Sequence, residues 1–175
     1  LHLCDRRQRQ MCIRDRPTLD QTKEAIFNSL GGYIQDFVIL DVFGGSGALS
    51  LESLSRGAKE AYIIDENPEA IKIIKQNAKS LNIGEELHIF QGTYREYLSR
   101  LKNHKFDIVF LDPPFRMKVI DELCDFLIRH DMIEDGGYIV CEYPKEDVVE
   151  KNYTGYRMKL CRRYSSSEIL ILEKE

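Results

Sequence analysis

The chain has 175 residues, 43% of them hydrophobic, and 25 Lys and Arg against 29 Asp and Glu give a formal net charge of −4. This composition supports a folded core, which excludes a disordered chain. No apolar run reaches the roughly 18 residues that a membrane-spanning helix needs. The negative net charge excludes a uniformly cationic nucleic-acid coat, so any contact with nucleic acid must come from a local basic patch.

The cysteines and histidines of the chain do not form a metal-binding pattern. The 5 Cys include no Cys-x-x-Cys pair, and the 4 His show no His-x-x-x-His spacing. We therefore expect reduced thiols, no metal site and no disulfide scaffold. No secretory signal is visible, which favours a cytoplasmic protein.

Residues 1–15 differ in character from the rest of the chain. They begin without Met, show no helical or strand period, and crowd four arginines together. One interpretation is a basic arm that binds RNA. The run RRQRQMCIRD, however, resembles translated sequencing-adapter DNA, which favours foreign sequence at the edge of a truncated gene. We expect 1–15 to be non-native and 16–175 to form a single domain.

From Arg16 onward, helical and strand-like patterns alternate without a linker or a repeat. The segment 18–21 has capping-box spacing and predicts a helix that ends before Gly31. Short apolar runs predict strands at 37–42, 61–65, 87–90, 106–111 and 138–141. Apolar residues at helical spacing predict helices between them, after Gly47, after Asn67, over 94–101 and through 119–127. This alternation predicts an α/β fold with a mostly parallel, doubly wound sheet.

The last part of the chain predicts a different arrangement of strands. Two strand-like segments, 156–164 and 168–172, are joined through three serines. Such a pair is typical of an antiparallel hairpin, which we expect at the edge of the sheet.

A glycine-rich turn, DVFGGSG at 41–47, follows the first predicted strand and opens a helix. In open α/β sheets, ligands bind at the carboxyl ends of strands, and glycine lets the backbone approach a ligand closely. Asp65 ends the next strand, where an acidic side chain binds the ribose of an adenosine cofactor. A nicotinamide enzyme uses a similar turn, although Ser50 stands where the dinucleotide fingerprint has its last glycine. A tight turn without a ligand is the structural alternative.

The sequence DPPF at 112–115 follows the apolar strand 106–111. Two prolines cannot join a sheet, so the chain must leave it rigidly, with the Asp112 carboxylate and the Pro113 carbonyl directed into the cleft. Both groups accept hydrogen bonds, and an exocyclic amine on a planar base has two hydrogens to donate. That amine nitrogen could then attack a sulfonium methyl group, while Phe115 stacks on a flipped-out base. A buried turn with Asp112 as a helix cap is the structural alternative.

Four segments in this order resemble one bacterial family: RPTLDQTKEAIFN at 16–28, DVFGGSG at 41–47, LSLESLSRGA at 49–58 and DPPF at 112–115. They are similar to the family that methylates guanine N2 in 16S ribosomal RNA, of the guanine-966 type. The resemblance covers the chain from Arg16 onward. It implies a Rossmann-like class I methyltransferase that uses S-adenosylmethionine, with 16S rRNA in an assembling small subunit as its partner.

The resemblance also implies roles for individual residues. The catalytic residues would be Asp112, Pro113, Pro114 and Phe115. The residues that bind the cofactor would be Asp41, Phe43, Gly45, Ser46, Gly47, Asp65 and Thr93. Thr93 stands where the family usually has an Asp that contacts adenine, and Gly44 where it usually has Ala. The basic hairpin that the family carries before Arg16 is replaced by residues 1–15.

Basic residues near the predicted cleft could meet RNA phosphates, namely Arg16, Lys23, Arg116 and Lys118. A position on a solvent-exposed helix face would explain these charged residues as well. A denser basic stretch, 157–163, fits either phosphate contacts or alternation on an edge strand.

Three other functions remain open from the sequence. N6-adenine methylation of DNA or RNA would use the same DPPF chemistry. A binding module would keep the cofactor without turnover, and a nicotinamide-dependent oxidoreductase would use the same glycine turn. We expect a monomer.

Overall fold

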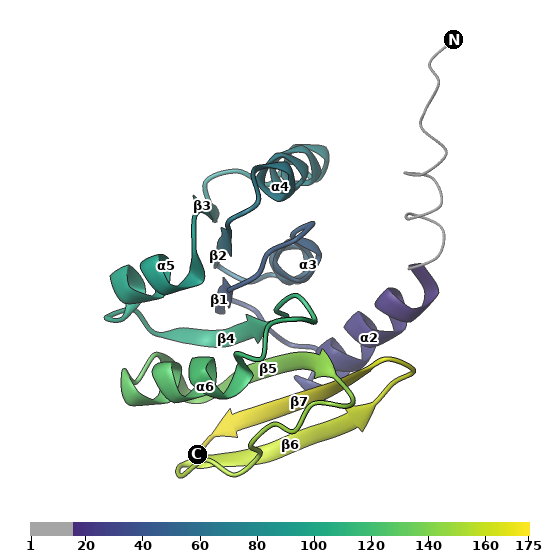
Figure 1. Ribbon diagram of the computed structural model, residues 1–175. Helices are drawn as coiled ribbons and strands as arrows, with labels where there is room; N and C mark the ends of the chain where they lie inside the picture. Colours follow the sequence, from purple (N-terminus) through teal and green to yellow (C-terminus); the bar gives the residue numbers. More distant parts are fainter. Residues whose placement is uncertain (1–15) are drawn as a thin grey trace. The chain divides into compact units, whose positions relative to one another are not determined.

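The structure is a computed structural model that describes residues 16–175 (Figure 1). The chain divides into two units, Leu1–Tyr33 and Ile34–Glu175. The described part of the first unit is helix α2 (Arg16–Ser29) and the turn after it; on α2, Ile26 and Phe27 are buried. This helix begins two residues before its predicted cap. The segment 1–15, predicted to be non-native, lies outside the described residues, so that division of the chain stays a prediction.

The second unit alternates strands and helices and then ends in three consecutive strands (Figure 1). Its elements are β1 (Val38–Asp41), α3 (Ala48–Ser55), β2 (Glu60–Asp65), α4 (Pro68–Ser80), β3 (Leu87–Gln91), α5 (Tyr94–Leu101), β4 (Phe106–Leu111), α6 (Ile120–Arg129), β5 (Ile133–Pro144), β6 (Tyr156–Arg163) and β7 (Ser167–Lys174). The predicted α/β alternation is confirmed, and each predicted strand is present.

All seven strands form one sheet in the order β3-β2-β1-β4-β5-β7-β6. The five strands from β3 to β5 are parallel, whereas β7 is antiparallel to both β5 and β6. The predicted doubly wound sheet with a C-terminal antiparallel hairpin is therefore confirmed. The order reverses between β1 and β4, which is where open α/β sheets bind their ligands.

Helices cover the two faces of this sheet because neighbouring residues of a buried strand point to opposite sides. In β2, Ile63 packs with Ile71 and Ile74 of α4. The next residue, Ile64, belongs instead to the large core cluster that includes Leu98 of α5 and Leu123 of α6. Helices α4 and α5 thus lie on opposite faces (Figure 1).

Strand β5 is longer than predicted and extends over Ile133–Pro144 rather than 138–141. The Gly136-Gly137 pair was predicted to introduce the strand, but the strand begins before this pair and continues through it with a shift in register against β4. A side chain at Gly137 would crowd two carbonyl oxygens, those of Glu134 and Asp107. Glycine therefore permits the irregular strand here rather than ending it.

Two further features concern the described residues. None of their helices is long and apolar enough to cross a membrane. Within residues 16–175 there is also no group of three or more His, Cys, Asp or Glu that could hold a metal ion. The described cysteines, Cys124, Cys141 and Cys161, are free thiols.

Candidate functional site

A cavity of about 530 Å³ opens where the strand order reverses, at the carboxyl ends of the parallel strands. Its wall comes from the segments that follow β1, β2, β3 and β4. The lining residues are Val42, Phe43, Gly45, Asp65, Glu66, Asn67, Ala70, Gly92, Tyr94, Asp112, Pro113, Pro114, Phe115 and Met117. The glycine turn, Asp65 and the DPPF motif therefore meet at one cavity, although they are far apart in sequence.

The glycine turn presents open backbone to this cavity. Gly45 has φ +54°, and a Cβ atom added there would meet nothing within 4 Å. Gly47 also has positive φ, +77°, and precedes α3 as its N-terminal cap residue. Such backbone favours glycine, because left-handed φ values strain other residues. The turn thus leaves room for a ligand to approach the main chain at Gly45.

Asp65 ties the glycine turn to the end of β2. Its Oδ2 accepts a hydrogen bond from the Gly45 backbone N at 2.8 Å, and its Oδ1 accepts one from the Asn67 backbone N at 2.8 Å. Each carboxylate oxygen has a second lone pair, so these bonds leave acceptor capacity for ligand hydroxyls. Asp65 therefore shapes the turn and lines the cavity at once.

The DPPF motif leaves the end of β4 as predicted, without joining the sheet. The Pro114 carbonyl accepts from the Met117 N at 2.8 Å, whereas the Pro113 carbonyl accepts no hydrogen bond from a described residue. Phe115 is 53% exposed, which is high for a large apolar side chain. The motif thus presents an available carbonyl and an available ring face at the cavity.

The Asp112 carboxyl is exposed to the cavity but surrounded by protein on its other sides. Burial, together with the nearby charges of Glu142 and Asp41, raises the pKa of Asp112 to about 8. Asp112 accepts no hydrogen bond from a described side chain or backbone group. A carboxyl group in this state gains most from a ligand that donates hydrogen bonds to it.

Four residues predicted to bind the cofactor do not line the cavity. Asp41 is buried behind the turn and accepts a hydrogen bond from Ser50 Oγ at 3.0 Å. Burial raises the pKa of Asp41 to about 7. Ser46 is exposed, and Gly47 packs toward Ile74. Asp41 and Gly47 therefore lie behind the turn rather than at the cavity.

Thr93, the fourth of these residues, is the N-terminal cap of α5. Its Oγ1 accepts a hydrogen bond from the Glu96 backbone N at 3.3 Å. The next residue, Tyr94, lines the cavity, is 8% exposed, and has a buried hydroxyl without a partner among the described residues. The rings of Tyr94 and Phe43 lie 5.4 Å apart. At this end of the cavity the structure places an aromatic pair where the sequence suggested a threonine contact.

Sequence reasoning missed seven lining residues, namely Val42, Glu66, Asn67, Ala70, Gly92, Tyr94 and Met117. Glu66 and Gly92 directly follow β2 and β3. The rule that ligands bind at the carboxyl ends of parallel strands could have found these two. Tyr94 and Met117 depend on how α5 and the segment after DPPF pack, which local patterns do not show.

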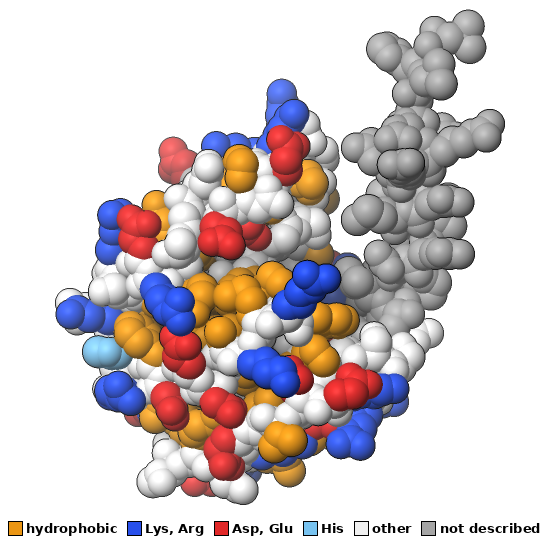
Figure 2. All heavy atoms as spheres, in the orientation of Figure 1, with side chains coloured by type: hydrophobic (Ala, Val, Ile, Leu, Met, Phe, Trp, Pro, Cys, Tyr) orange, Lys and Arg blue, Asp and Glu red, His pale blue; other side chains and the backbone are white. Residues whose placement is uncertain are grey.

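The predicted RNA-contacting residues are distributed over both units. Arg16 and Lys23 belong to α2 in the first unit, and their role stays a prediction. In the second unit, Arg116 is exposed, and Lys118 is 79% exposed and pairs with Asp147 at 3.4 Å. Figure 2 shows hydrophobic side chains gathered at the middle of one molecular face, with both basic and acidic side chains around them.

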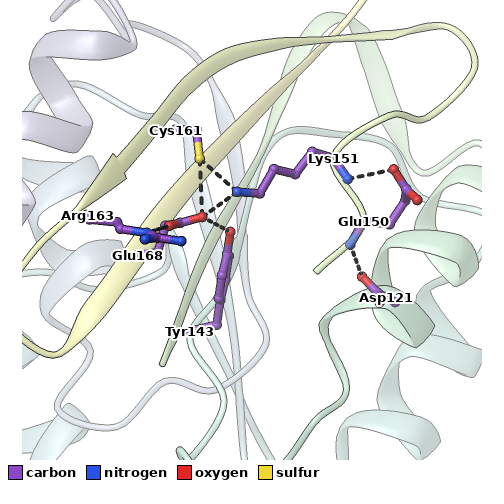
Figure 3. Close-up of polar contacts among 7 residues, drawn as sticks. All are labelled: Asp121, Tyr143, Glu150, Lys151, Cys161, Arg163 and Glu168. Carbon is purple, nitrogen blue, oxygen red and sulfur yellow. Dashed lines mark hydrogen bonds and ion pairs between the residues drawn. The ribbon is translucent and has the colours of Figure 1, made fainter. Parts of the chain in front are cut away.

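The basic stretch 157–163 is engaged in contacts within the sheet. Arg157 and Lys159 pair with Glu173. Arg163 pairs with Glu168, which is only 3% exposed and also accepts from Tyr143, Lys151 and Cys161 (Figure 3). These contacts favour the interpretation of this stretch as part of an edge strand.

Comparisons with known proteins show the family of the chain. The family described as conserved hypothetical protein 95 matches residues 6–173. YlbH of Bacillus subtilis (strain 168), named as a candidate rRNA methyltransferase, is 30% identical over 161 residues, 91% of this chain and 88% of its own. Ribosomal RNA small subunit methyltransferase D of Escherichia coli (strain K12) is 33% identical over 148 residues, 83% of this chain and 74% of its own.

A solved structure shares the same fold. The Escherichia coli protein yhhF, titled as a candidate methyltransferase, has a TM-score of 0.81 and 28% identity, covering 91% of this chain and 87% of its own. The family match covers nearly all of the chain, and the curated relatives align over most of their length. The chain therefore belongs to the family described as conserved hypothetical protein 95, and the methyltransferase resemblance predicted from its motifs is confirmed.

Proposed function

We propose that this chain transfers the methyl group of S-adenosylmethionine to the exocyclic N2 of a guanine in 16S ribosomal RNA. One observation carries this proposal: a glycine turn with Asp65 and an Asp-Pro-Pro-Phe motif line the same cavity. A cofactor held at the first and a planar base held at the second would bring a methyl donor and an amine together. Relatives named as small-subunit rRNA methyltransferases support the choice of RNA.

The cavity fits S-adenosylmethionine in size and charge. Its volume of about 530 Å³ falls within the ~300–1,000 Å³ typical of small-molecule sites. Its acidic lining residues are Asp65, Glu66 and Asp112, and no described Lys or Arg lines it. Such an acidic surface favours a cationic sulfonium over the anionic diphosphate of a nicotinamide dinucleotide. The charge of the lining thus supports a methyltransferase over the oxidoreductase alternative.

The cofactor would be held by the segments after β1, β2 and β3. Gly45 would let it approach the backbone, Asp65 would accept hydrogen bonds from its ribose hydroxyls, and Tyr94 would offer a ring and an unpartnered hydroxyl. When bound, S-adenosylmethionine supplies an electrophilic methyl group on a positively charged sulfur. The residues of the chain contribute position and exclusion of water.

The target amine would be held by the segment after β4. The Asp112 carboxylate and the Pro113 carbonyl would each accept one hydrogen of the exocyclic amine. These bonds draw electron density onto the nitrogen and aim its lone pair at the methyl group. Phe115, which is half exposed, would stack on the face of the flipped base.

Substrate context is part of the same proposal. We infer that the chain acts as a cytoplasmic monomer on 16S rRNA in an assembling small subunit. Nucleoside mass spectrometry and primer extension on RNA from a deletion strain test the target. Loss of N2-methylguanine at one position of 16S rRNA is expected. Loss of N6-methyladenine with N2-methylguanine intact would instead establish adenine methylation, the alternative that shares the amine chemistry.

Replacing Asp112 with Ala separates binding from catalysis. We expect the affinity for S-adenosylmethionine to change less than about twofold and methylation of small-subunit RNA to fall at least ~100-fold, because an oriented acceptor is lost. Calorimetry and tritiated methyl transfer measure the two effects. Asp125→Ala, at an exposed position of α6, is the matched control and should behave like the unaltered protein. If the unaltered protein binds the cofactor but methylates no RNA, the binding-module alternative holds.

A further inference from the structure

Asp112 has an acidic neighbour on the adjacent strand. Strands β4 and β5 pair Leu111 with Cys141, and Asp112 and Glu142 are the residues that directly follow this pair. Leu111 and Cys141 both belong to the core cluster on the α5 and α6 face. Because side chains alternate along strands, Glu142, the residue of β5 after Cys141, points to the opposite face. Asp112 lines the cavity, and Glu142 is close enough for its charge to act on Asp112.

Hydrogen bonds distinguish Asp112 from the acids on either side of it. On β5, Glu142 Oε1 accepts from Ser167 Oγ at 2.8 Å, and Ser167 is only 5% exposed. On β1, Asp41 Oδ2 accepts from Ser50 Oγ at 3.0 Å. Asp112, between them, accepts no hydrogen bond from a described residue. The flanking carboxyl groups are therefore held by serines, and Asp112 alone is left for a ligand.

The charges that face Asp112 within residues 34–175 are negative. Besides burial, Glu142 and then Asp41 raise the pKa of Asp112. Burial also raises the pKa of Glu142, which its bond from Ser167 partly offsets. Lys118 follows on the same segment as Asp112 but is exposed and paired with Asp147. A carboxylate with like charges beside it gains more from taking up a proton.

We propose that Glu142, held by Ser167, is a positioning residue that makes the Asp112 carboxylate the acceptor of the proton that the methylated amine releases. The inference rests on the proposed function. As the bond between the amine nitrogen and the methyl carbon forms, the carbon–sulfur bond breaks and its electron pair stays on sulfur. The nitrogen becomes positively charged and loses one proton, which moves to an Asp112 oxygen. Glu142 acts only through Asp112 and does not touch the base.

Titration of Asp112 tests the structural part of this inference. Carboxyl-carbon NMR can follow Asp112 in the full chain, with Asp112→Asn to assign its resonance. Glu142→Gln removes the neighbouring charge but keeps an oxygen that can accept from Ser167. We expect it to lower the pKa of Asp112 by about 1. Glu146→Gln, at an exposed position four residues on, is the matched control and should leave this pKa unchanged.

Ser167→Ala is a second variant, in which the Glu142 carboxylate is still present. Without its serine, Glu142 favours its neutral form more strongly, so the pKa of Asp112 should again fall, by less than in Glu142→Gln. If the pKa of Asp112 in Glu142→Gln and in Ser167→Ala equals its pKa in the Glu146→Gln control, the inference is overturned.

The pH dependence of single-turnover methylation tests the catalytic part. In Glu142→Gln, the acid limb of the rate should move to lower pH by about 1, with a plateau that is a few-fold slower because Asp112 is a weaker base. Unchanged affinity for S-adenosylmethionine would show that the cavity is intact. If the unaltered protein methylates guanine and Glu142→Gln has the same pH profile, the inference fails and the proposed function stands. If the unaltered protein methylates no guanine, the proposed function fails, whatever the titration shows.

Discussion

Gly44 is where the glycine turn packs most closely on β2. A Cβ atom at this position would overlap Cγ2 of Ile63, which is fully buried, and would also crowd Ile74 of α4. In this chain Ile63 fills the space that an alanine methyl group would need. The turn and β2 are therefore matched to each other residue by residue.

Replacing Gly44 with Ala should destabilise the protein by about 1–3 kcal/mol, because the added methyl group overpacks a buried contact. Urea unfolding measures this change. Gly84→Ala is the matched control, since its added Cβ would have only ordinary contact with a flexible Glu86 side chain. A double variant with Ile63→Ala should be less destabilised than the sum of the two single changes. Equal stability of Gly44→Ala and Gly84→Ala would contradict this account of the contact.

Individual residues differ in how far the sequence predicted their roles. Asp112 and Phe115 could be placed at the cavity because two prolines force the chain out of a sheet, which is a local rule. Thr93 could not, because whether its hydroxyl caps α5 or faces a ligand depends on the exact end of the helix. Asp41 likewise belongs to a recognisable motif, yet its carboxylate accepts a hydrogen bond from Ser50 behind the turn. The position of a motif was predictable, whereas the direction of each side chain was not.

At the scale of elements, α4 both lines the cavity through Ala70 and supports the glycine turn through Asn77. Asn77 of α4 donates a hydrogen bond from Nδ2 to the Ser46 carbonyl at 3.0 Å, across 31 positions of sequence. The helix itself is held at its start by Asn67, whose side chain accepts from the Glu69 backbone N. The turn is thus fixed from two sides, by Asp65 and by this helix.

Asn77→Ala should weaken binding of S-adenosylmethionine about fivefold, since one net hydrogen bond is worth ~1 kcal/mol and the turn loses part of its support. Calorimetry gives the affinity, and circular dichroism should show an unchanged helix content. Gln76→Ala, at the neighbouring exposed position of α4, removes a side chain that does not reach the turn. An Asn77→Ala affinity equal to that of Gln76→Ala would show that the turn holds its shape alone.

The order of the elements was predictable from periodicity, but their limits were less so. Short apolar runs predicted each parallel strand, because strands that are covered on both faces are apolar nearly throughout. Strand β5 is longer than predicted, because Gly136 and Gly137 permit an irregular register inside the strand. In the sequence, a pair of glycines is more typical of a turn before a strand. The partner of each strand was not predictable beyond the general rule, since register depends on contacts between segments far apart in the chain.

At the scale of the whole sheet, Glu168 joins β5, β6, β7 and the segment after β5 (Figure 3). Burial alone would raise its pKa, but hydrogen bonds from Lys151, Arg163, Tyr143 and Cys161 outweigh burial and lower the pKa to about 2. The folded value therefore lies below the ordinary value of 4.5. By linkage, this carboxylate stabilises the fold above about pH 4.5, and the contribution is lost as the pH falls toward 2.

Glu168→Gln should lower the free energy of unfolding at pH 7 by on the order of 2 kcal/mol, because charged hydrogen bonds are replaced by weaker ones. The difference from the unaltered protein should shrink between pH 4.5 and pH 2. Urea unfolding at several pH values measures both. Glu146→Gln, which removes an exposed carboxylate, is the control. Its difference in unfolding free energy from the unaltered protein should not shrink between pH 4.5 and pH 2. A constant difference at every pH would mean that packing, not charge, makes Glu168 important.

Strand β7 lies inside the sheet, with β5 on one side and β6 on the other. Its residues Ile169, Leu170, Ile171 and Leu172 are fully buried. Such an apolar, β-prone run is hazardous when its backbone groups are unpaired, because it can add a strand from a second molecule. Strand β6 covers it with an irregular register near Met158 and with four basic side chains, which discourage edge-to-edge pairing. The stability of this outer hairpin therefore governs the resistance of the protein to aggregation.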